Sequence, residues 1–321
     1  MSKEIETSEL NLMLSVVKKY YELGMNQEQI AKEEFISKSS VCRLIKKAVA
    51  NGYVRFQINY PIESVQSLEN EFHKRFKLEK VFITPSYTDD HDIRLRDTCR
   101  SMANDLCKIM QPNDILCVSW GSTMDKLAGI ISKEMNTNKK CSRVVMMNGS
   151  AAGDIISTKS AQIVEQLAEC FDAEGYILPV PLIVDNKHTA DVIKEDSHVK
   201  YVIDYARKSN IAVFSIGATS YKSVLRKRGA YSKEDYDEIL SLGAVGDIAG
   251  YCFNIQGEPV SKGVDERMIG LPLEDIKSKK TRMGIAVGEK KVEAIIGALH
   301  GGLVNRFYVD EMTAEQVIKN L

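Results

Sequence analysis

The loop from Val118 to Met124 has residue types that suit an anion, and it follows an apolar run. Gly121 permits close approach of the backbone, and Ser122 and Thr123 add hydroxyls to the free N–H groups at the start of a helix. This combination suits a phosphate group. The loop has neither the lysine of a nucleotide P-loop nor the three glycines of a dinucleotide-binding loop, so ATP and NAD are poor candidates and we expect no cofactor. The alternative is an ordinary N-capped turn.

Two further loops have a similar design. The loop that begins at Met147 offers Asn148, Gly149 and Ser150 directly after another apolar run. In the third loop, Lys290 and Lys291 stand between an apolar run and a predicted helix, where a lysine opposes the helix dipole unless an anion accompanies it. We therefore interpret Lys291 as the counter-charge of a phosphate, with Lys290 as the alternative. A solvated loop is the other interpretation.

One carboxylate lies between glycines in the stretch Gly246 to Gly250. In a glycine-flanked turn, Asp247 could accept hydrogen bonds from the hydroxyls of a sugar. A carboxylate that only stabilises the turn is the alternative.

The window from Lys38 to Tyr60 is basic, although the whole chain has 43 Lys and Arg against 44 Asp and Glu. It contains five basic residues and no acidic one, so it is a candidate for contact with a polyanion. We expect Arg43 to contact guanine, Lys38 and Ser39 to read or brace the first bases, and the remaining side chains to contact phosphates. Those remaining side chains are Ser37, Ser40 and Lys47. A three-helix module that binds another protein is the alternative.

Three helices are expected to position these side chains. Leu10, Leu14, Val17 and Tyr21 form an apolar helical stripe that ends at Gly24. A short second helix follows, in which Asn26 and Gln29 form a capping box and Ile30, Ala31 and Phe35 face inward. Ser37 caps a third helix that ends at Asn51-Gly52, and alternation from Tyr53 to Asn59 predicts a strand. Residues 1–60 are therefore predicted to form a winged helix-turn-helix, with the third helix in the major groove.

A linker helix is predicted within residues 61–80, from Pro61 to about Lys77. Its apolar seam requires a partner, either the following domain or a second copy of the chain. From Val81 to Leu321, short apolar runs alternate with helical stretches, which predicts a Rossmann-like α/β domain with a mainly parallel sheet covered on both faces. In such sheets, ligands bind beyond the carboxyl ends of the strands. The expected strands are Val81–Thr84, Ile115–Ser119, Arg143–Met147, Ile177–Val184, Ile211–Ile216, Tyr251–Ile255, Met283–Val287 and Arg306–Val309. The expected helices are Asp92–Met110, Met124–Met135, Ser160–Phe171, Thr189–Lys208, Ser232–Leu240, Val292–Leu299 and Thr313–Asn320.

The composition is that of an ordinary globular protein, with 321 residues, 44% hydrophobic and 27% charged. The length favours two domains. The acidic start MSKEIETSE lacks the features of a signal peptide, and the apolar runs are too short to cross a membrane, so we expect a cytoplasmic protein. Seven scattered cysteines predict neither disulfides nor a metal site.

Five motifs together resemble those of the bacterial SorC-type transcriptional regulators, which are also grouped with one branch of the DeoR-type regulators. They are Asn26–Ala31, Ser40–Leu44, Ser119–Met124, Ala244–Ile248 and Gly297–Gly301. The resemblance spans nearly the whole chain. It implies a regulator of a sugar-catabolic operon whose C-terminal domain is similar to sugar-phosphate isomerases and senses a phosphorylated sugar or polyol. It also implies a homodimer or homotetramer.

Carried over onto matching positions, the resemblance makes Gly121, Ser122, Thr123 and Lys291 holders of the phosphate and Asp247 a hydroxyl acceptor. Some relatives have Lys or Arg where this chain has Asn148. We therefore expect neither an imine to an aldehyde effector nor an extra guanidinium contact at that position.

The hypothesis is a repressor or activator whose affinity for operator DNA is gated by a phosphorylated sugar. The alternative is a sugar-phosphate isomerase or deaminase, which would need an acid–base pair. Asp247 has no evident partner for that chemistry, and we predict that the protein is not an enzyme. A third possibility is a redox-sensing repressor that uses Cys42 in the third helix.

Overall fold

The computed structural model describes residues 2–54, 56, 63–135, 138–150, 159–221, 223–227 and 229–321. The chain divides into two compact units, Met1–Tyr60 and Pro61–Leu321. In the described part of the chain, no helix is both long enough and apolar enough to cross a membrane.

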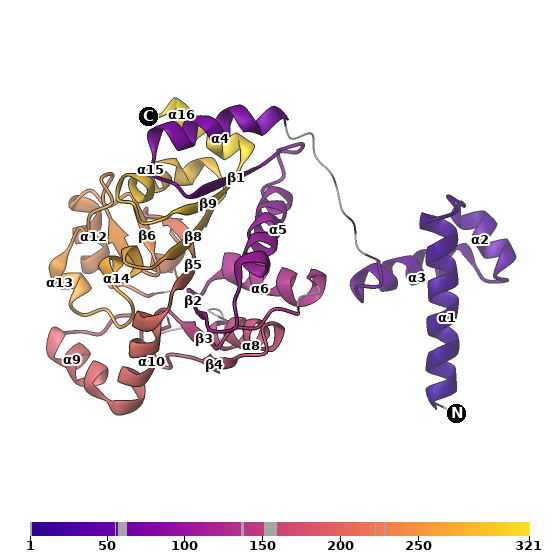
Figure 1. Cartoon of the computed structure of the whole chain (residues 1–321), viewed down its shortest axis with the longest axis horizontal. Coiled ribbons are helices and arrows are strands. Elements are labelled where there is room, and N and C mark those ends of the chain that lie inside the picture. The colour runs from indigo at the N-terminus through magenta and orange to yellow at the C-terminus, as the bar shows by residue number, and fades with distance from the viewer. Residues whose placement is uncertain are drawn as a thin grey trace. The chain divides into compact units, whose positions relative to one another are not determined.

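Three helices make up the described part of the first unit: α1 (Ser2–Tyr21), α2 (Gln27–Glu33) and α3 (Lys38–Ala50) (Figure 1). The predicted caps are confirmed. The side chain of Asn26 accepts hydrogen bonds from the N–H groups of Glu28 and Gln29, and that of Ser37 accepts one from Ser40. The core residues of this unit are Met13, Val16, Ile30, Val41, Leu44, Ile45 and Ala48.

Three positions of this unit that were predicted to be apolar contacts are exposed. Phe35 is 94% exposed because the short turn between α2 and α3 places it at φ +54°, which directs its side chain to solvent. In α1, Met13 and Val16 are buried, whereas Leu14 and Tyr21 are exposed. Both sets have helical spacing, so periodicity alone does not decide which of them faces α3. The predicted strand Tyr53–Asn59 lies mostly outside the described residues.

A mainly parallel sheet forms the centre of the second unit, as predicted. Its strands are β1 (Lys80–Thr84), β2 (Ile115–Val118), β3 (Arg143–Met146), β4 (Glu174–Tyr176), β5 (Ile211–Ala218), β8 (Thr281–Ala286) and β9 (Arg306–Asp310). Their order is β1-β9-β8-β5-β2-β3-β4, and all neighbours in it are parallel. The chain adds β3 and β4 on one side of β2 and then returns to the other side with β5. The strand order therefore reverses between β2 and β5, and such a reversal is where open α/β sheets bind ligands.

Helices cover both faces of this sheet (Figure 1). One layer contains α5 (His91–Ile109), α6 (Ser122–Glu134) and α8 (Ser160–Cys170). The helices on the opposite side include α10 (Ser197–Lys208) and α15 (Val292–His300). The shorter described helices are α9 (Lys187–Glu195), α11 (Val224–Lys227), α12 (Lys233–Ser241), α13 (Lys262–Asp265), α14 (Leu273–Lys277) and α16 (Glu311–Lys319).

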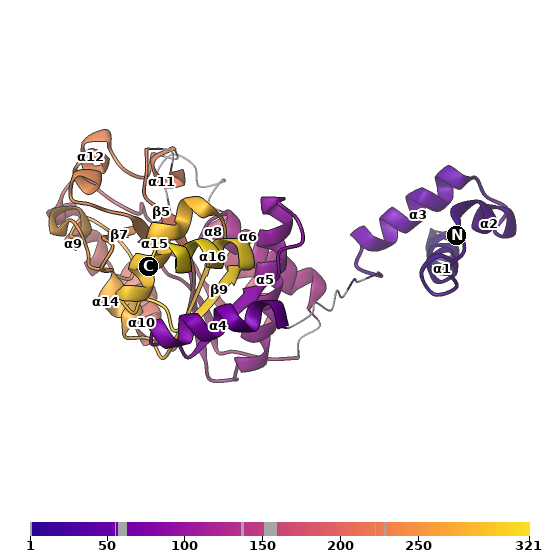
Figure 2. The same cartoon turned by 90° about the horizontal axis from the view of Figure 1, so that it is seen from above.

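The helix predicted within the linker packs on the sheet domain. It is α4 (Glu63–Arg75), which contacts β1 and α16, and Figure 2 shows it beside α16. Val65 and Phe72 are buried in the core of the second unit, and the Phe72 ring lies 5.9 Å from that of Phe307. The apolar seam of this helix is thus covered by the following domain, which was one of the two partners considered.

Three sequence predictions in the second unit need correction. The stretch Ile177–Val184 is no continuous strand, because Pro179 and Pro181 lack the N–H groups that a strand donates, and it contributes only isolated bridges. The helix predicted over Thr189–Lys208 is two helices, since Asp196 ends α9 and caps α10. The supposed turn around Asp247 is strand β6 (Gly246–Ile248), which pairs with both β5 and β7 (Tyr251–Phe253).

Candidate functional site

The turn between β2 and α6 presents an open helix N-terminus. Gly121 is the N-cap residue of α6, has φ +125° and provides no side-chain hydrogen bond to the helix. Among the described residues, the N–H groups of the first turn therefore remain available to an anion. Ser122 is exposed there and Thr123 is buried.

The loop after β3 is held by packing. Gly149 cannot carry a side chain, because a Cβ atom would lie 2.5 Å from the Pro181 carbonyl oxygen. Its own carbonyl oxygen accepts a 2.7 Å hydrogen bond from Trp120 Nε1, which ties this loop to the β2–α6 turn. Ser150 Oγ lies 3.3 Å from Ser160 Oγ.

Asn148 is the residue of this loop with unused bonding capacity. It is 1% exposed and donates from Nδ2 to the Ala249 carbonyl oxygen at 2.9 Å. Its Oδ1 has no hydrogen-bond partner in the described part of the chain. A buried amide oxygen without a partner destabilises a protein, so a ligand hydroxyl that donated to Oδ1 would relieve this cost.

The carboxylate of Asp247 lies over the end of β5. Asp247 is paired with Gly217, and a Cβ atom on Gly217 would fall 2.0 Å from Asp247 Oδ1. Burial raises the pKa of Asp247 to about 6, against the opposing effects of the Gly250 N–H group and the charge of Lys291. Sequence reasoning missed Gly217; the signal for it was a glycine just after the apolar run Ile211–Ile216.

Lys291 and Lys290 differ sharply in their environments. Both belong to the 3₁₀ turn Glu289–Lys291 after β8, but Lys290 is exposed whereas Lys291 is half-buried. Burial lowers the pKa of Lys291, and the nearby carboxylate of Asp247 acts against this. No described side chain forms a hydrogen bond or ion pair with Lys291 Nζ.

Cys99 connects this lysine to the start of α6. The charge of Lys291 acts on the Cys99 thiol, whose Sγ atom lies 4.0 Å from the Thr123 carbonyl oxygen. The partly desolvated cation thus acts on a thiol that contacts the first turn of α6.

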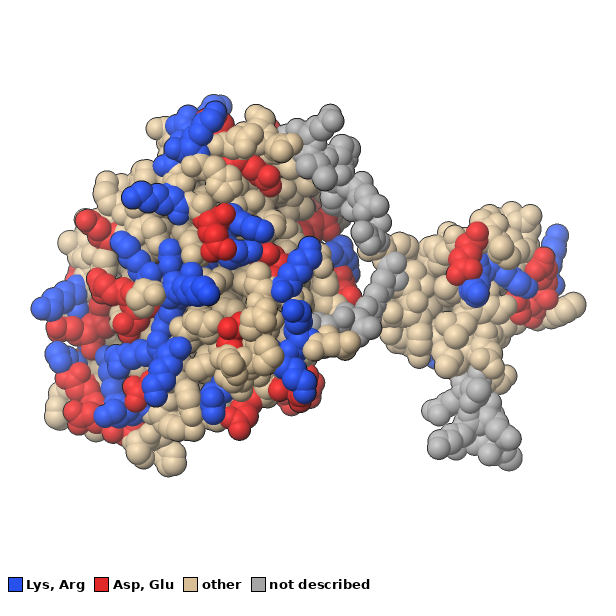
Figure 3. Space-filling view, viewed as in Figure 1, with Lys and Arg blue, Asp and Glu red and all other residues tan. Residues whose placement is uncertain are grey.

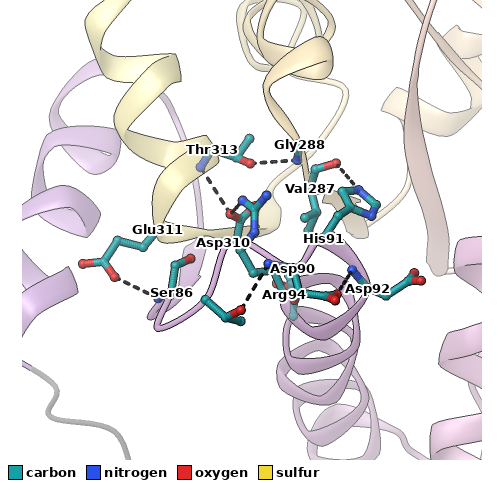
Figure 4. Close-up of polar contacts among 12 residues, drawn as sticks. Ser86, Asp90, His91, Asp92, Arg94, Val287, Gly288, Asp310, Glu311 and Thr313 are labelled. Atoms are coloured by element: carbon teal, nitrogen blue, oxygen red, sulfur yellow. Dashed lines mark hydrogen bonds and ion pairs between the residues drawn. The ribbon is translucent and has the colours of Figure 1, made fainter.

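The loop that carries Lys291 is braced from two helices (Figure 4). The N–H group of Gly288 donates to Thr313 Oγ1 at 2.8 Å, and Asp310, the N-cap residue of α16, accepts from the N–H group of Thr313. The same carboxylate forms a buried ion pair with Arg94 of α5. His91 Nε2 lies 3.4 Å from the Val287 carbonyl oxygen. These contacts fix the backbone of the loop before any ligand arrives.

The ionised carboxylate of Asp247 is expected to lower the free energy of unfolding of the protein above pH 6. In the folded protein this group keeps its proton up to about pH 6, whereas the unfolded chain loses it near pH 4, so its contribution to stability falls as the pH rises between these values. Asp247→Asn should therefore raise the free energy of unfolding by roughly 1–2 kcal/mol at pH 8 and by little at pH 4.5. Urea unfolding at both pH values measures this.

The matched control for this prediction is Glu289→Gln, which removes an exposed carboxylate from the neighbouring loop. It should shift stability equally and slightly at both pH values. A pH-independent effect of Asp247→Asn would contradict the prediction.

The outward face of α3 carries the side chains proposed to contact DNA. Lys38 and Lys47 are exposed and form ion pairs with Glu28 and Glu9, at 2.8 and 2.7 Å. Arg43 is exposed and has no such partner among the described residues. Exposed ion pairs of this kind contribute little to stability and can be exchanged for phosphates.

The serines at the start of α3 are hydrogen-bonded to one another. Ser37 Oγ lies 2.8 Å from Ser39 Oγ and 2.9 Å from Ser40 Oγ, in addition to capping the helix. Ser37 and Ser39 remain exposed, and Ser40 is partly buried. All six predicted DNA-contact residues thus lie on or directly before one helix.

The comparisons with known proteins cover almost the whole chain. The Sugar-bind family model, described as "Putative sugar-binding domain", matches residues 60–319. The chain is 29% identical over 310 residues to the deoxyribonucleoside regulator of Bacillus subtilis (strain 168), covering 97% of this chain and 98% of that protein. It is 30% identical over 309 residues to the transcriptional regulator LsrR of Escherichia coli (strain K12), covering 94% of this chain and 92% of that one.

Solved structures show the same fold. The full-length sorbitol operon regulator SorC from Klebsiella pneumoniae matches with a TM-score of 0.75 and 24% identity, over 96% of this chain and 98% of that chain. The sequence relatives named above are regulators rather than enzymes. The chain therefore belongs to the SorC/DeoR family of sugar-binding transcriptional regulators.

Proposed function

We propose that this regulator senses a phosphorylated sugar or polyol, and that the phosphate binds between the N-terminus of α6 and Lys291. The observation that carries the proposal is the half-buried Lys291, which no described acidic side chain pairs. Burial disfavours this cation and no described side chain bonds to it directly, so a phosphate oxygen in contact with it would be favourable. Gly121, Ser122 and Thr123 contribute N–H groups and hydroxyls from the other side.

The sugar portion of the effector is assigned to Asp247 and the loop after β3. Asp247 accepts hydrogen bonds from two hydroxyls, and the free Oδ1 of Asn148 accepts a third. Gly149 and Ser150 shape this end of the site through the backbone. Lys290, which is exposed, attracts the anion without contacting it.

The first unit is proposed to bind operator DNA of a carbohydrate catabolic operon through α3. Residues 1–60 form the DNA-binding domain, and Arg43 reads a base from the major groove. Lys38 and Ser39 brace the first bases, and the other three side chains contact phosphates, with the protein acting as a homodimer or homotetramer. When one recognition helix of such an assembly binds its half-site, the effective concentration of the other helix at the second half-site rises. This compensates for the weak affinity of a single helix.

Effector binding is proposed to change DNA affinity through the braced loop and the helices beside it. Gly288 donates to Thr313 of α16, and α16 contacts α4, the first described helix after residue 60. An effector that binds two arrangements of these helices unequally shifts their populations. A coupling of 1–3 kcal/mol would change operator affinity by roughly 5-fold to 150-fold.

Thermal unfolding of the full-length protein tests the effector class. A panel of pentose, hexose and polyol phosphates is compared with the unphosphorylated parents at equal concentration. A matching phosphorylated compound at about 100 times its Kd should raise the Tm by about 5 °C, because it binds only the folded state. Its unphosphorylated parent should leave the Tm unchanged. Equal stabilisation by both would contradict the phosphate assignment.

A further inference from the structure

A cavity of about 390 Å³ lies on the α10 side of the sheet domain. Its wall is formed by α9, α10 and the segment that contains Asp265, Gly270 and Pro272. Its volume falls in the range of small-molecule sites. The lining residues include none of those assigned above to the effector.

The hydroxyl of Tyr251 faces this cavity without a partner. The residue is 3% exposed, and no described group forms a hydrogen bond with its hydroxyl. Tyr251 lines the cavity, so its hydroxyl can donate to or accept from a ligand there. The cavity is therefore the place where a partner for this hydroxyl would be found.

Asp265 is a second polar residue on the same wall, and it is partly buried. Its carboxylate has neither a hydrogen bond nor an ion pair with any residue that the structure describes. Burial raises the pKa of Asp265 to about 7, and the neighbouring Glu274 adds to this effect. A ligand hydroxyl that donated to this carboxylate would satisfy it.

Basic side chains lie along the remaining wall. Lys200, Ile203 and Arg207 follow one face of α10, and Lys194 lies on α9. Lys200 has no acidic partner in the described ranges, whereas Arg207 pairs with Asp275 at 3.1 Å. Burial lowers the pKa of Lys194. Figure 3 shows Lys and Arg side chains interspersed with acidic ones over the face where Figure 1 places α10 and α14.

The charge balance of the lining selects the kind of anion. Asp191, Glu195 and Asp265 oppose the three basic residues, so the formal charges cancel. A phosphate dianion would meet carboxylates as well as cations here. A carboxylate with a single charge near Lys194 and Lys200 is the better match.

We propose that this cavity binds a small hydroxylated carboxylic acid, with its carboxylate near Lys194 and Lys200 and its hydroxyls on Tyr251 and Asp265. This site is separate from the proposed effector site and does not depend on it. An occupant would contact α10, and α10 packs on β2 and β3, whose carboxyl ends lead into two of the effector loops.

The test uses three six-carbon probes on the full-length protein: D-gluconate, D-sorbitol and hexanoate. Sorbitol has the hydroxyls without the charge, and hexanoate has the charge without the hydroxyls. Hydrogen exchange measured by mass spectrometry should slow over residues 197–208 and 265–272 with gluconate only. The proposal fails if gluconate protects neither segment, or if hexanoate protects them equally.

Calorimetric titration of gluconate into variants locates the contacts. Tyr251→Phe, which removes only the hydroxyl, should weaken binding about fivefold, and Asp265→Asn and Lys200→Ala about tenfold. Lys208→Ala, on the same helix but outside the cavity lining, should leave binding unchanged. Equal losses from Lys200→Ala and Lys208→Ala would indicate unspecific charge attraction and overturn the proposal.

The Lys291→Ala protein separates this site from the effector site. The affinity of gluconate for the Lys291→Ala protein should equal its affinity for the unchanged protein. Glucose 6-phosphate should bind the Lys291→Ala protein more weakly than gluconate does. Loss of gluconate binding in this variant, or tighter binding of glucose 6-phosphate, would contradict a separate site for carboxylates.

Discussion

Replacing Arg43 with alanine is expected to lower the affinity of the protein for its operator DNA by about 100-fold. Arg43 lies in the middle of the exposed face of α3, and in the described structure it is committed to no ion pair. A guanidinium in this position can donate two hydrogen bonds to one guanine, which no other side chain on this helix can replace. Fluorescence anisotropy with a labelled duplex from the promoter of its own operon measures the loss.

Lys46→Ala is the matched control for Arg43→Ala. Lys46 is also exposed on α3 and has no described ion pair, so its removal deletes the same charge from the same helix. Lys46→Ala should lower the affinity for operator DNA only a few-fold, and it should lower the affinity for duplexes of random sequence by the same factor. Equal losses for the two variants would show that α3 contributes charge but reads no base. Effector binding should be unaffected in both.

Lys291→Ala is expected to weaken binding of the phosphorylated effector by roughly 10-fold to 100-fold, the range for hydrogen bonds to charged groups. No described side chain forms an ion pair with the half-buried ammonium, so a bound phosphate would gain a direct charge interaction in partly desolvated surroundings. The free protein should lose no stability, because the variant removes a desolvated charge. Calorimetric titration with the compound that gives the largest rise in Tm measures the change.

Lys290→Ala, one residue away, is the control for Lys291→Ala. Its side chain is exposed, so its charge is screened by solvent and its removal should change affinity by about twofold or less. If Lys290→Ala weakened effector binding as much as Lys291→Ala does, the assignment of Lys291 as the phosphate contact would be wrong. Binding of an unphosphorylated parent should be equally poor in all three proteins.

Local signals predicted local structure well. Asn26 and Gln29 form their capping box and Ser37 its helix cap, because each depends only on side chains within three residues. The alternation of apolar runs with helical stretches also predicted a parallel sheet, since parallel strands need long crossover connections, which are usually helices. The carboxyl ends of parallel strands lie at one edge of a sheet. The loops that follow β2, β3 and β8 were therefore expected at the same edge.

What the sequence could not supply is contact between distant segments. Asp247 was expected in a turn and lies on a strand, because its pairing with Gly217 of β5 spans thirty residues of sequence. The exposure of Phe35 is set by the positive φ angle of this residue in the turn, and its apolar side chain gives no sign of it. Likewise, the burial that distinguishes Lys291 from the exposed Lys290 is a property of the folded domain.

Trp120 has a consequence for how this protein can be observed. It is the single tryptophan of the chain, it directly precedes Gly121, and its indole N–H group donates to the Gly149 carbonyl oxygen. The indole is therefore in contact with two of the three loops assigned to the effector. Its intrinsic fluorescence comes from one place in the molecule, so the emission of unlabelled protein reports directly on the polarity and motion of that place.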